Sequence, residues 1–137
     1  MTDVSSQNPE AVLHIACVRS YDVRDVNEGA GHYRALVDAL WPRGVAKKDL
    51  DFDEWAKDVA PSADLREDFH HGRLSFADFA ARYREELAAH GRAEALAERA
   101  RAAGARTLDL LYSARDTEHN NAVVLCDYLL ACEGAPA

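Results

Sequence analysis

The sequence lacks the features that mark several common protein classes. Cysteine is scarce: Cys17, Cys126 and Cys132 are the only ones, and no two form a Cys-x-x-Cys pair. This odd count indicates reduced thiols in a cytosolic protein. Cys17 and Cys126 lie in apolar segments, which favours a buried structural role for both. No apolar run reaches the ~18 residues of a membrane span, and the polar N-terminus lacks a signal-peptide core. We therefore expect a cytoplasmic protein without a membrane partner.

Basic residues are also few, with 16 Lys and Arg against 24 Asp and Glu, which gives a formal charge of −8. Proteins that bind nucleic acid need a basic footprint for the phosphate backbone, so this balance argues against nucleic acid as a partner. The arginine-rich stretch from Arg92 to Arg106 changes this little, because Glu94 and Glu98 interleave with its arginines.

Known nucleotide, hydrolase and metal motifs are missing as well. There is no Walker loop, nucleophile elbow, Gly-x-Gly-x-x-Gly motif or zinc-finger spacing. His70 and His71 are adjacent, so their side chains diverge on a helix and no third ligand follows at a useful spacing. Asp116 and His119 are better placed, yet two ligands do not define a metal site. We assign no metal, and the sequence leaves the cofactor unknown.

What the sequence does contain is an alternation of strand-like and helix-like segments, in a chain that is 48% hydrophobic. Periodicity and capping signals predict three strands (Ala11–Tyr21, Tyr33–Trp41 and Ala105–Ala114) and five helices (Asp49–Ala60, Ser62–Phe69, Ser75–Gly91, Ala93–Ala103 and His119–Cys132). This order predicts a small three-layer α/β domain over residues 11–133, with a mostly parallel sheet flanked by helices. Residues 1–10 are expected to be a disordered lead-in and 134–137 a flexible tail.

Two polar clusters follow predicted strands, WPRG at Trp41 to Gly44 and SARDTEHNN at Ser113 to Asn121. In open α/β sheets, ligands bind beyond the carboxyl ends of the strands. Each cluster also has an ordinary structural interpretation. WPRG can be a tight turn with Trp41 packed over the core, and Thr117 or Asp116 can cap the last helix.

The functional interpretation of the second cluster rests on its side-chain chemistry. The first-turn amides of a following helix favour an anion, and the guanidinium of Arg115 suits phosphate or carboxylate. His119 can donate, accept or carry a proton near neutral pH, which makes it an acid/base candidate together with Asp116. Asn120 and Asn121 are poor helix formers, so they are locally unfavourable unless they cap or bind something.

The first cluster extends this hypothesis. Arg43 would be a second cation beside Arg115, and Trp41 would be a stacking wall for the ligand. Lys57 could add a further charge, although a surface lysine is the plainer interpretation. The hypothesis therefore requires Arg43 and Arg115 to approach each other in space.

Several longer segments are distinctive: LVDALWPRGVAKKDLDFDEWAKDVAPS, LREDF, FAARYREEL and LLYSARDTEHNNAVVLCDYL. Together, from about Ile15 to Leu130, they resemble the small bacterial and archaeal proteins grouped as domain of unknown function 488, of the YeaO-like type. The resemblance implies a compact α/β domain and specifies no reaction. Residue 39 is alanine where similar proteins often carry arginine, so any role of that arginine would be missing here.

These observations support two hypotheses about function. The first is a cytoplasmic enzyme or ligand-binding domain for an anionic small molecule, held by Arg43 and Arg115 with Asp116 and His119 as acid/base candidates. The second is a non-enzymatic regulatory or interaction module, in which the polar clusters are structural. The sequence does not decide the oligomeric state.

Overall fold

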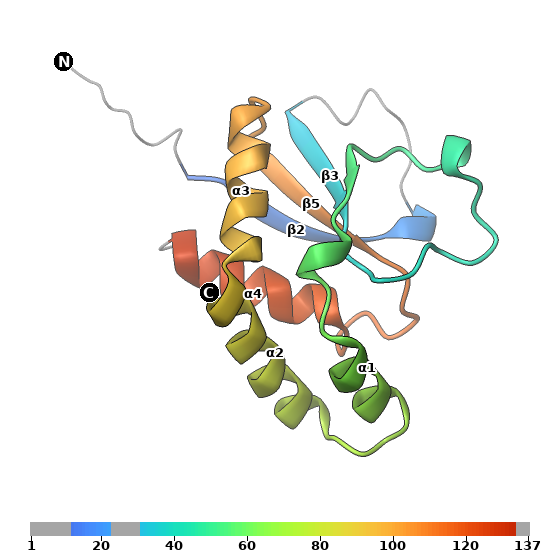
Figure 1. The fold of residues 1–137 in the computed structure, drawn as a ribbon. Coiled ribbons are helices and arrows are strands. Elements are labelled where there is room, and N and C mark those ends of the chain that lie inside the picture. The colour runs from blue at the N-terminus through green and yellow to red at the C-terminus, as the bar shows by residue number, and fades with distance from the viewer. Residues whose placement is uncertain (1–11, 23–30, 134–137) are drawn as a thin grey trace.

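The computed structural model describes residues 12–22 and 31–133. Four parallel strands form one sheet in the order β2-β5-β3-β4 (Figure 1). Their bounds are His14–Arg19 for β2, His32–Leu36 for β3, Glu54–Trp55 for β4 and Thr107–Tyr112 for β5. The small α/β domain with a parallel sheet that the sequence predicts is therefore confirmed. The lead-in predicted at 1–10 and the tail predicted at 134–137 lie outside the described residues.

Strand β5 lies between β2 and β3 although it is the last of the four strands along the chain. Leu108 pairs with Ile15 on one side and with Tyr33 on the other. Leu108, Leu110 and Leu111 are fully buried, as expected for a parallel strand that is covered on both faces. Because side chains alternate along a strand, Leu108 and Leu110 face one layer and Leu111 faces the other.

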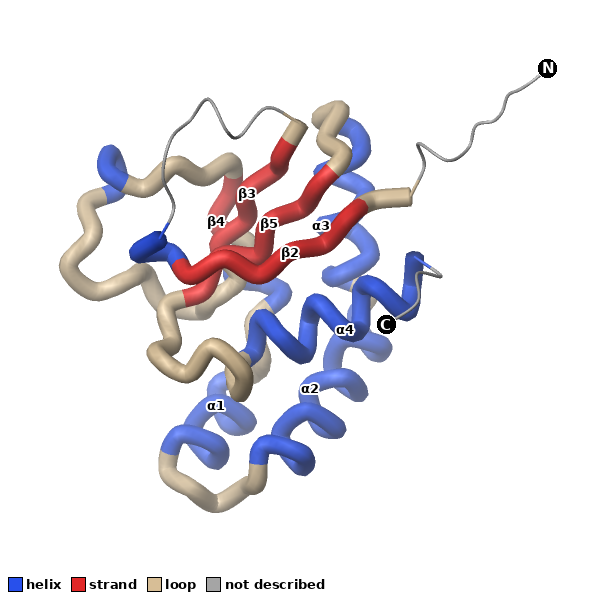
Figure 2. Tube along the Cα trace, turned by 180° about the vertical axis from the view of Figure 1, so that it is seen from behind, coloured by secondary structure: helices blue, strands red, loops and turns tan. Residues whose placement is uncertain are grey.

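Four helices follow the capping signals of the sequence: α1 (Ala63–His70), α2 (Phe76–His90), α3 (Arg92–Ala102) and α4 (Asn121–Glu133) (Figure 2). The Ser62 hydroxyl accepts a bond from the Leu65 amide, and the Ser75 hydroxyl accepts one from the Asp78 amide. These bonds satisfy amides that a helix start would otherwise leave unpaired. Gly91 joins α2 to α3 at φ 70°, a conformation that glycine adopts without strain.

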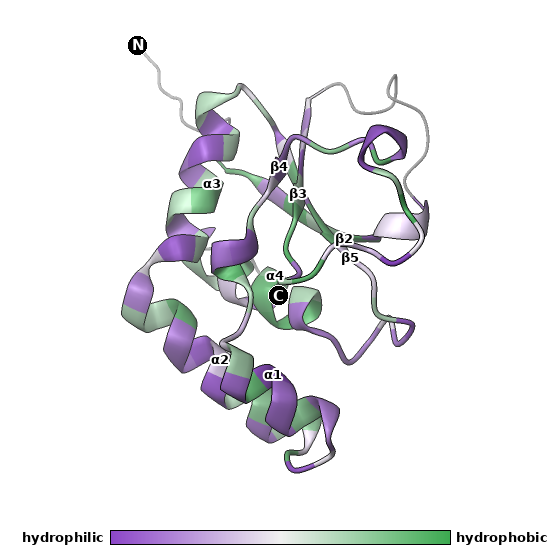
Figure 3. Ribbon diagram, turned by 45° about the vertical axis from the view of Figure 1, so that its right-hand side comes forward, coloured by the Kyte–Doolittle hydropathy of each residue, from purple (hydrophilic) through white to green (hydrophobic). Residues whose placement is uncertain are grey.

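The main hydrophobic core lies between the sheet and these helices. In α2 and α3, hydrophilic and hydrophobic residues alternate, whereas α4 is mostly hydrophobic (Figure 3). Tyr83 of α2 is fully buried, and its hydroxyl donates to the carbonyl oxygen of Val59. Helix α2 turns one apolar side to the core, since Phe79, Ala80, Tyr83 and Leu87 are all buried.

The opposite face of the sheet is covered by the segment 38–53, which forms the third layer in place of further helices. A second, smaller cluster lies here, with Leu36 and Leu111 of the sheet against Leu50, Trp41 and Phe52. The Trp41 ring meets the Phe52 ring edge to face, with centroids 5.3 Å apart. This packing fixes the polypeptide that follows β3.

A buried ionic network anchors the same segment to the sheet. Arg34 of β3 pairs through Nη1 with Asp51, and its Nε lies 3.6 Å from Oδ2 of Asp109. The same Asp109 oxygen lies 2.8 Å from Nδ1 of His32. Asp109 is only 4% exposed, so its charge depends on these two partners.

Two elements differ from the sequence prediction. The strand predicted at Tyr33–Trp41 ends at Leu36, because the chain turns away there to build the second cluster. The helix predicted at Asp49–Ala60 is wrong: this region contains two 3-10 turns (Lys47–Asp49 and Lys57–Val59) and the short strand β4. The apolar residues that suggested one helical face divide between two cores, with Phe52 in the small cluster and Val59 in the main one.

The ends of the strands create a crevice. The chain leaves β3 toward the segment 38–53, which covers one face of the sheet, and leaves β5 toward α4, which packs on the other. Neighbouring strands whose connections go to opposite faces leave an open space beyond their carboxyl ends. No helix in the described part of the chain is long and apolar enough to span a membrane.

Candidate functional site

A pocket of about 800 Å³ opens at this carboxyl edge of the sheet. Its wall is built by Tyr21 after β2, by residues 38–43 after β3, by several residues of 61–79, and by several residues of 113–121. The two polar clusters therefore meet in space. Six of the eight site residues predicted from the sequence line the pocket: Trp41, Arg43, Asp116, His119, Asn120 and Asn121.

The floor of the pocket is a polar network that joins three strand ends. The Ser113 amide after β5 donates to Oδ2 of Asp38 after β3, at 2.9 Å. The Ser113 hydroxyl lies 3.1 Å from that of Ser20, which follows β2 and is buried. Asn121 at the start of α4 donates from Nδ2 to the Val37 carbonyl oxygen at 3.1 Å. These bonds hold the strand ends in register beneath the pocket.

Asp38 is the charged member of this floor, and sequence reasoning missed it. Burial raises the pKa of its carboxyl group, while hydrogen bonds from Asn121 and Ser113 act in the opposite direction. Asp38 is part of the pocket lining. The predicted strand at Tyr33–Trp41 concealed it, since a residue inside a strand is not expected at a strand end. The available signal was an aspartate three residues before Trp41-Pro42, where a strand is expected to end.

Asp116 organises the turn that precedes α4. Its Oδ1 accepts the backbone amides of Glu118 (2.9 Å) and His119 (3.0 Å), and its Oδ2 lies 3.0 Å from Nδ1 of His119. The two amides and the imidazole lower the pKa of the Asp116 carboxyl group. His119 also meets the Phe76 ring edge to face at 5.0 Å. The imidazole is thus held through Nδ1 and one ring face, which leaves Nε2 as its remaining polar atom.

Asn120, rather than Thr117 or Asp116, caps the last helix. Its Oδ1 accepts the Val123 amide at 2.9 Å, and its Nδ2 donates to the Asp116 carbonyl oxygen at 2.8 Å. The side chain is buried, with the residue 3% exposed. The polar run at 116–121 therefore caps twice, within the turn through Asp116 and at the helix through Asn120, whereas Asn121 bonds to the end of β3.

Arg43 and Trp41 form a second wall. The Trp41 indole donates to the Val45 carbonyl oxygen and packs on Trp55, with ring centroids 5.4 Å apart. The Arg43 side chain is exposed, and its carbonyl oxygen accepts a bond from the Tyr21 hydroxyl at 2.9 Å. Trp41 is therefore fixed by packing, whereas the guanidinium of Arg43 stays in contact with solvent at the pocket.

Helix α1 supplies pocket residues that the sequence did not indicate. Arg66 donates from Nε to the Pro61 carbonyl oxygen at 3.1 Å, which holds its side chain along the wall. Phe69 and Phe79 stack with centroids 4.4 Å apart and provide an apolar side. A short helix between two breakers gives no sequence signal that it faces the carboxyl edge, so Arg66 required the tertiary structure.

Two predicted site residues lie outside the lining. Arg115 is exposed and does not belong to the pocket wall. Lys57 is also exposed, and its Nζ lies 4.3 Å from the centroid of the Trp55 ring, a cation–π contact that accounts for its position. The second cation at the pocket wall is Arg66, not Arg115.

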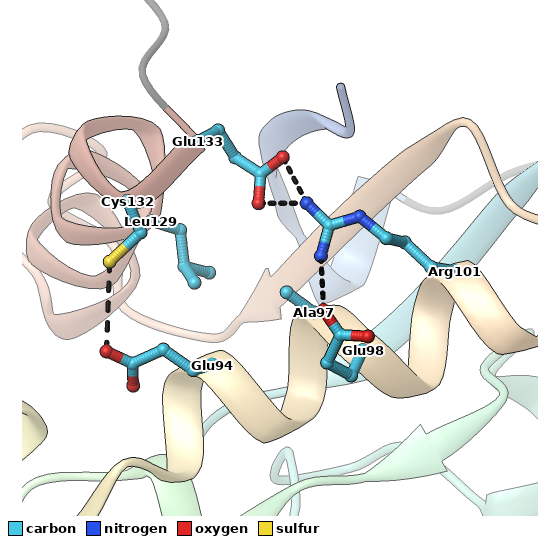
Figure 4. Close-up of a pocket in the computed structure, with 7 residues that line it drawn as sticks. All are labelled: Glu94, Ala97, Glu98, Arg101, Leu129, Cys132 and Glu133. Carbon is cyan, nitrogen blue, oxygen red and sulfur yellow. Dashed lines mark hydrogen bonds and ion pairs between the residues drawn. The ribbon is translucent and has the colours of Figure 1, made fainter. Parts of the chain in front are cut away.

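A smaller hollow of about 470 Å³ lies between α3 and α4 (Figure 4). Arg101 reaches across it to Glu133, whose Oε1 also accepts the Leu13 amide at 3.0 Å. The side chain of Glu133 is 6% exposed. This hollow holds none of the predicted site residues. Its ion pair links the end of α4 to α3, and the bond from the Leu13 amide links Glu133 to the chain before β2.

The cysteines and histidines do not form a metal centre. Cys17 and Cys126 pack against the main core, and the Cys17 thiol donates to the Ala122 carbonyl oxygen at 3.4 Å. Burial and the neighbouring Cys126 raise the pKa of the Cys17 thiol. Within residues 12–22 and 31–133, no three His, Cys, Asp or Glu side chains are grouped closely enough to hold a metal ion.

Comparisons with known proteins bear on this pocket. A family model described as "Inactive DUF488-N3 subclade" matches residues 14–133. The "Uncharacterized protein YeaO" of Escherichia coli is 44% identical over 118 residues, which cover 85% of this chain and 97% of that protein. The "Uncharacterized protein Rv3073c" of Mycobacterium tuberculosis is 39% identical over 115 residues, which cover 84% and 92%. No solved structure matches this chain.

Proposed function

The chain belongs to the DUF488 family, within the subclade described as inactive, and from this premise we propose that it is a ligand-binding domain for an anionic small molecule. The observation that carries the proposal is the pocket at the carboxyl edge of the sheet, where two polar clusters far apart in the sequence come together. The word "inactive" in the family description favours binding over catalysis.

The charge of the ligand follows from the side chains at the wall. Arg43 and Arg66 both line the pocket, and each guanidinium can donate two parallel bonds to a carboxylate or phosphate. The carboxylate oxygens of nearby Asp116 are occupied by its own turn and by His119. Because the whole chain carries a charge of −8 and Asp38 and Glu67 also line the pocket, an anion would be attracted only to the part of the wall that the two guanidinium groups form.

The body of the ligand follows from the apolar residues. Phe69, Phe79 and Trp41 belong to the lining, although Phe79 is only 2% exposed. Leu40 lies at the pocket and is 72% exposed, so a bound apolar group would remove its side chain from water. We therefore propose an anionic group attached to an apolar or aromatic body.

Asp116 and His119 have a binding role in this proposal. The Asp116 carboxylate orients the imidazole through Nδ1, so Nε2 is directed as a donor or an acceptor toward a ligand. This arrangement resembles an oriented acid/base pair, but neither Asp116 nor His119 is hydrogen-bonded to the Ser113 hydroxyl, which lies 3.1 Å from that of Ser20. We therefore assign His119 to ligand recognition. Asn120 and Asn121 position the wall.

The proposal is tested by calorimetric titration with 3-phenylpropionate, which joins a carboxylate to an aromatic ring. Arg43→Ala and Arg66→Ala should each weaken binding about tenfold, since a charge-assisted hydrogen bond contributes roughly 1.5–3 kcal/mol. Arg84→Ala is the matched control, because Arg84 is an exposed arginine of α2 outside the pocket lining. If the parent does not bind the probe, or if both pocket variants bind it as the parent does, the proposal fails.

A second candidate function is a non-enzymatic interaction module. It is favoured by the caps, because Asp116, Asn120 and Asn121 direct their hydrogen bonds to backbone groups of the protein itself. On this alternative, Arg115→Ala and His119→Ala lower the melting temperature by several degrees and no small anion binds. The expected cytoplasmic location belongs to the same proposals and is supported by three free cysteines.

A further inference from the structure

We infer that the ligand of this pocket also carries a protonated nitrogen, which binds the carboxylate of Asp38, so that the pocket accepts a zwitterion. This inference rests on the proposed function and extends it to the chemical class of the ligand. The anionic end would meet Arg43 and Arg66 at the wall, and the cationic end would reach the floor between the ends of β3 and β5.

The first support is the missing counterion of Asp38. Other carboxylates that the fold removes from water have one: Asp109 and Glu133, each with a side chain 6% exposed, pair with Arg34 and Arg101. Within the described residues, no Lys, Arg or His lies within 4.0 Å of the Asp38 carboxylate. A charge removed from water is costly unless it is paired. Asp38 differs in this from Asp109 and Glu133. Partly buried Glu86 also has no ion pair among the described residues, but it accepts two bonds from Ser62 and lies outside the pocket, whereas Asp38 is part of the lining.

The second support is the remaining bonding capacity of this carboxylate. Its partners are the Ser113 amide at 2.9 Å and the side chains of Ser113 and Asn121. All three are neutral donors, and an ionised carboxylate offers about four lone-pair sites. The network therefore fixes the direction of the carboxylate and leaves room for one more donor. A ligand nitrogen can complete it without breaking any bond of the floor.

The third support is geometric. Asp38 and Arg43 lie at the two ends of the same lining stretch, residues 38–43, and Trp41 between them is fixed by its packing on Phe52 and Trp55. Asp38 and Arg43 form no ion pair with each other among the described residues, so each remains available to a ligand group. An amino-acid-like molecule with an aromatic or large apolar side chain matches these groups. Its ammonium group would bind Asp38, its carboxylate would bind Arg43, and its side chain would lie against the apolar residues.

Three probes with the same phenyl-bearing skeleton separate the contributions: 3-phenylpropionate with the anion alone, 2-phenylethylamine with the cation alone, and L-phenylalanine with both. Each is titrated at pH 7 into the parent, Asp38→Asn and Arg43→Ala, with Arg84→Ala as the control. Asparagine keeps an oxygen that can accept the Ser113 amide, removes the charge and exchanges the second acceptor oxygen for an NH2 donor. Thermal unfolding verifies that each variant is folded.

The inference predicts that the parent binds phenylalanine at least about tenfold more tightly than 3-phenylpropionate, as one added charge-assisted bond allows. Asp38→Asn should abolish this preference and leave 3-phenylpropionate binding unchanged, whereas Arg43→Ala should weaken both acids. Equal affinity of the parent for the two acids, or a preference that survives in Asp38→Asn, would overturn the inference and leave the proposed anion site intact. If 2-phenylethylamine alone binds and depends on Asp38, the cation site stands and the proposed anion site fails. If none of the three probes binds, both fail.

Discussion

Asn120 offers a sharp test of how the site is built, because it serves two bonds from one buried side chain. Its Oδ1 accepts the Val123 amide at 2.9 Å, and its Nδ2 donates to the Asp116 carbonyl oxygen at 2.8 Å. The residue is 3% exposed. Asn120→Ala removes both bonds and the helix cap together, without changing the charge of the pocket.

The expected loss of stability can be worked out from these bonds. Losing an N-cap costs about 1 kcal/mol, and stranding the Asp116 carbonyl oxygen costs about 1–2 kcal/mol, since its turn is exposed and water partly replaces the donor. The free energy of unfolding should therefore fall by about 2–3 kcal/mol. For a domain of this size each kcal/mol lowers the melting temperature by roughly 3–5 °C, which gives a decrease of about 6–15 °C.

The assay is thermal unfolding followed by far-ultraviolet circular dichroism, with urea unfolding as a second measure. Asn120→Ser is the matched control, because a serine hydroxyl can still accept the Val123 amide while the amide donor to the Asp116 carbonyl oxygen is lost. It should lose less stability than Asn120→Ala. An Asn120→Ala protein that melts within about 2 °C of the parent would refute the cap assignment and return Asn120 to the ligand-binding role predicted from the sequence.

Three further predictions concern charged groups. Arg34→Ala should lower the free energy of unfolding in urea by roughly 3 kcal/mol, because it removes a partner of buried Asp109. Arg73→Ala is its control: the Arg73 side chain is 61% exposed in its pair with Asp68, so the loss should be under about 1 kcal/mol. The Asp116 carboxyl group should titrate below the usual aspartate range in carbon NMR, so its contribution to stability is present at neutral pH and is lost as the pH falls through its lowered pKa. Asp38→Asn should unfold no more easily than the parent at pH 7. Any stability advantage of Asp38→Asn over the parent should shrink as the pH falls through the raised pKa of folded Asp38 toward the ordinary aspartate value. Below that value the carboxyl group is neutral in the folded and the unfolded protein.

Local signals in the sequence predicted much of the fold. Ser62 and Ser75 marked helix starts because a hydroxyl before a helical stripe satisfies free amides, and both bonds are present. The strand predicted at Ala105–Ala114 is present as β5, Thr107–Tyr112, between β2 and β3 in the sheet. Each of these features depends on residues within a few positions of one another.

Features that depend on distant pairing were not predictable in the same way. Strand β4 exists because Asp53 and Ala56 donate their amides to the carbonyl oxygens of Arg34 and Leu36, and no local pattern reports those partners. The same is true of the site. The sequence predicted Trp41, Arg43 and the 113–121 cluster at one edge of the sheet, because parallel strands end at the same edge. Asp38 and Arg66 emerged only with the true end of β3 and the position of α1.

The central claim is that the pocket at the carboxyl edge binds an anionic small molecule, and a residue-resolved titration tests it most directly. The measurement is the amide ¹H–¹⁵N spectrum of the ¹⁵N-labelled protein with increasing 3-phenylpropionate. The account predicts saturable shifts at lining residues from both clusters, above all Leu40, Arg43, Ser113 and Asn121. Spectra that do not change, or shifts confined to the hollow around Arg101 between α3 and α4, would contradict it.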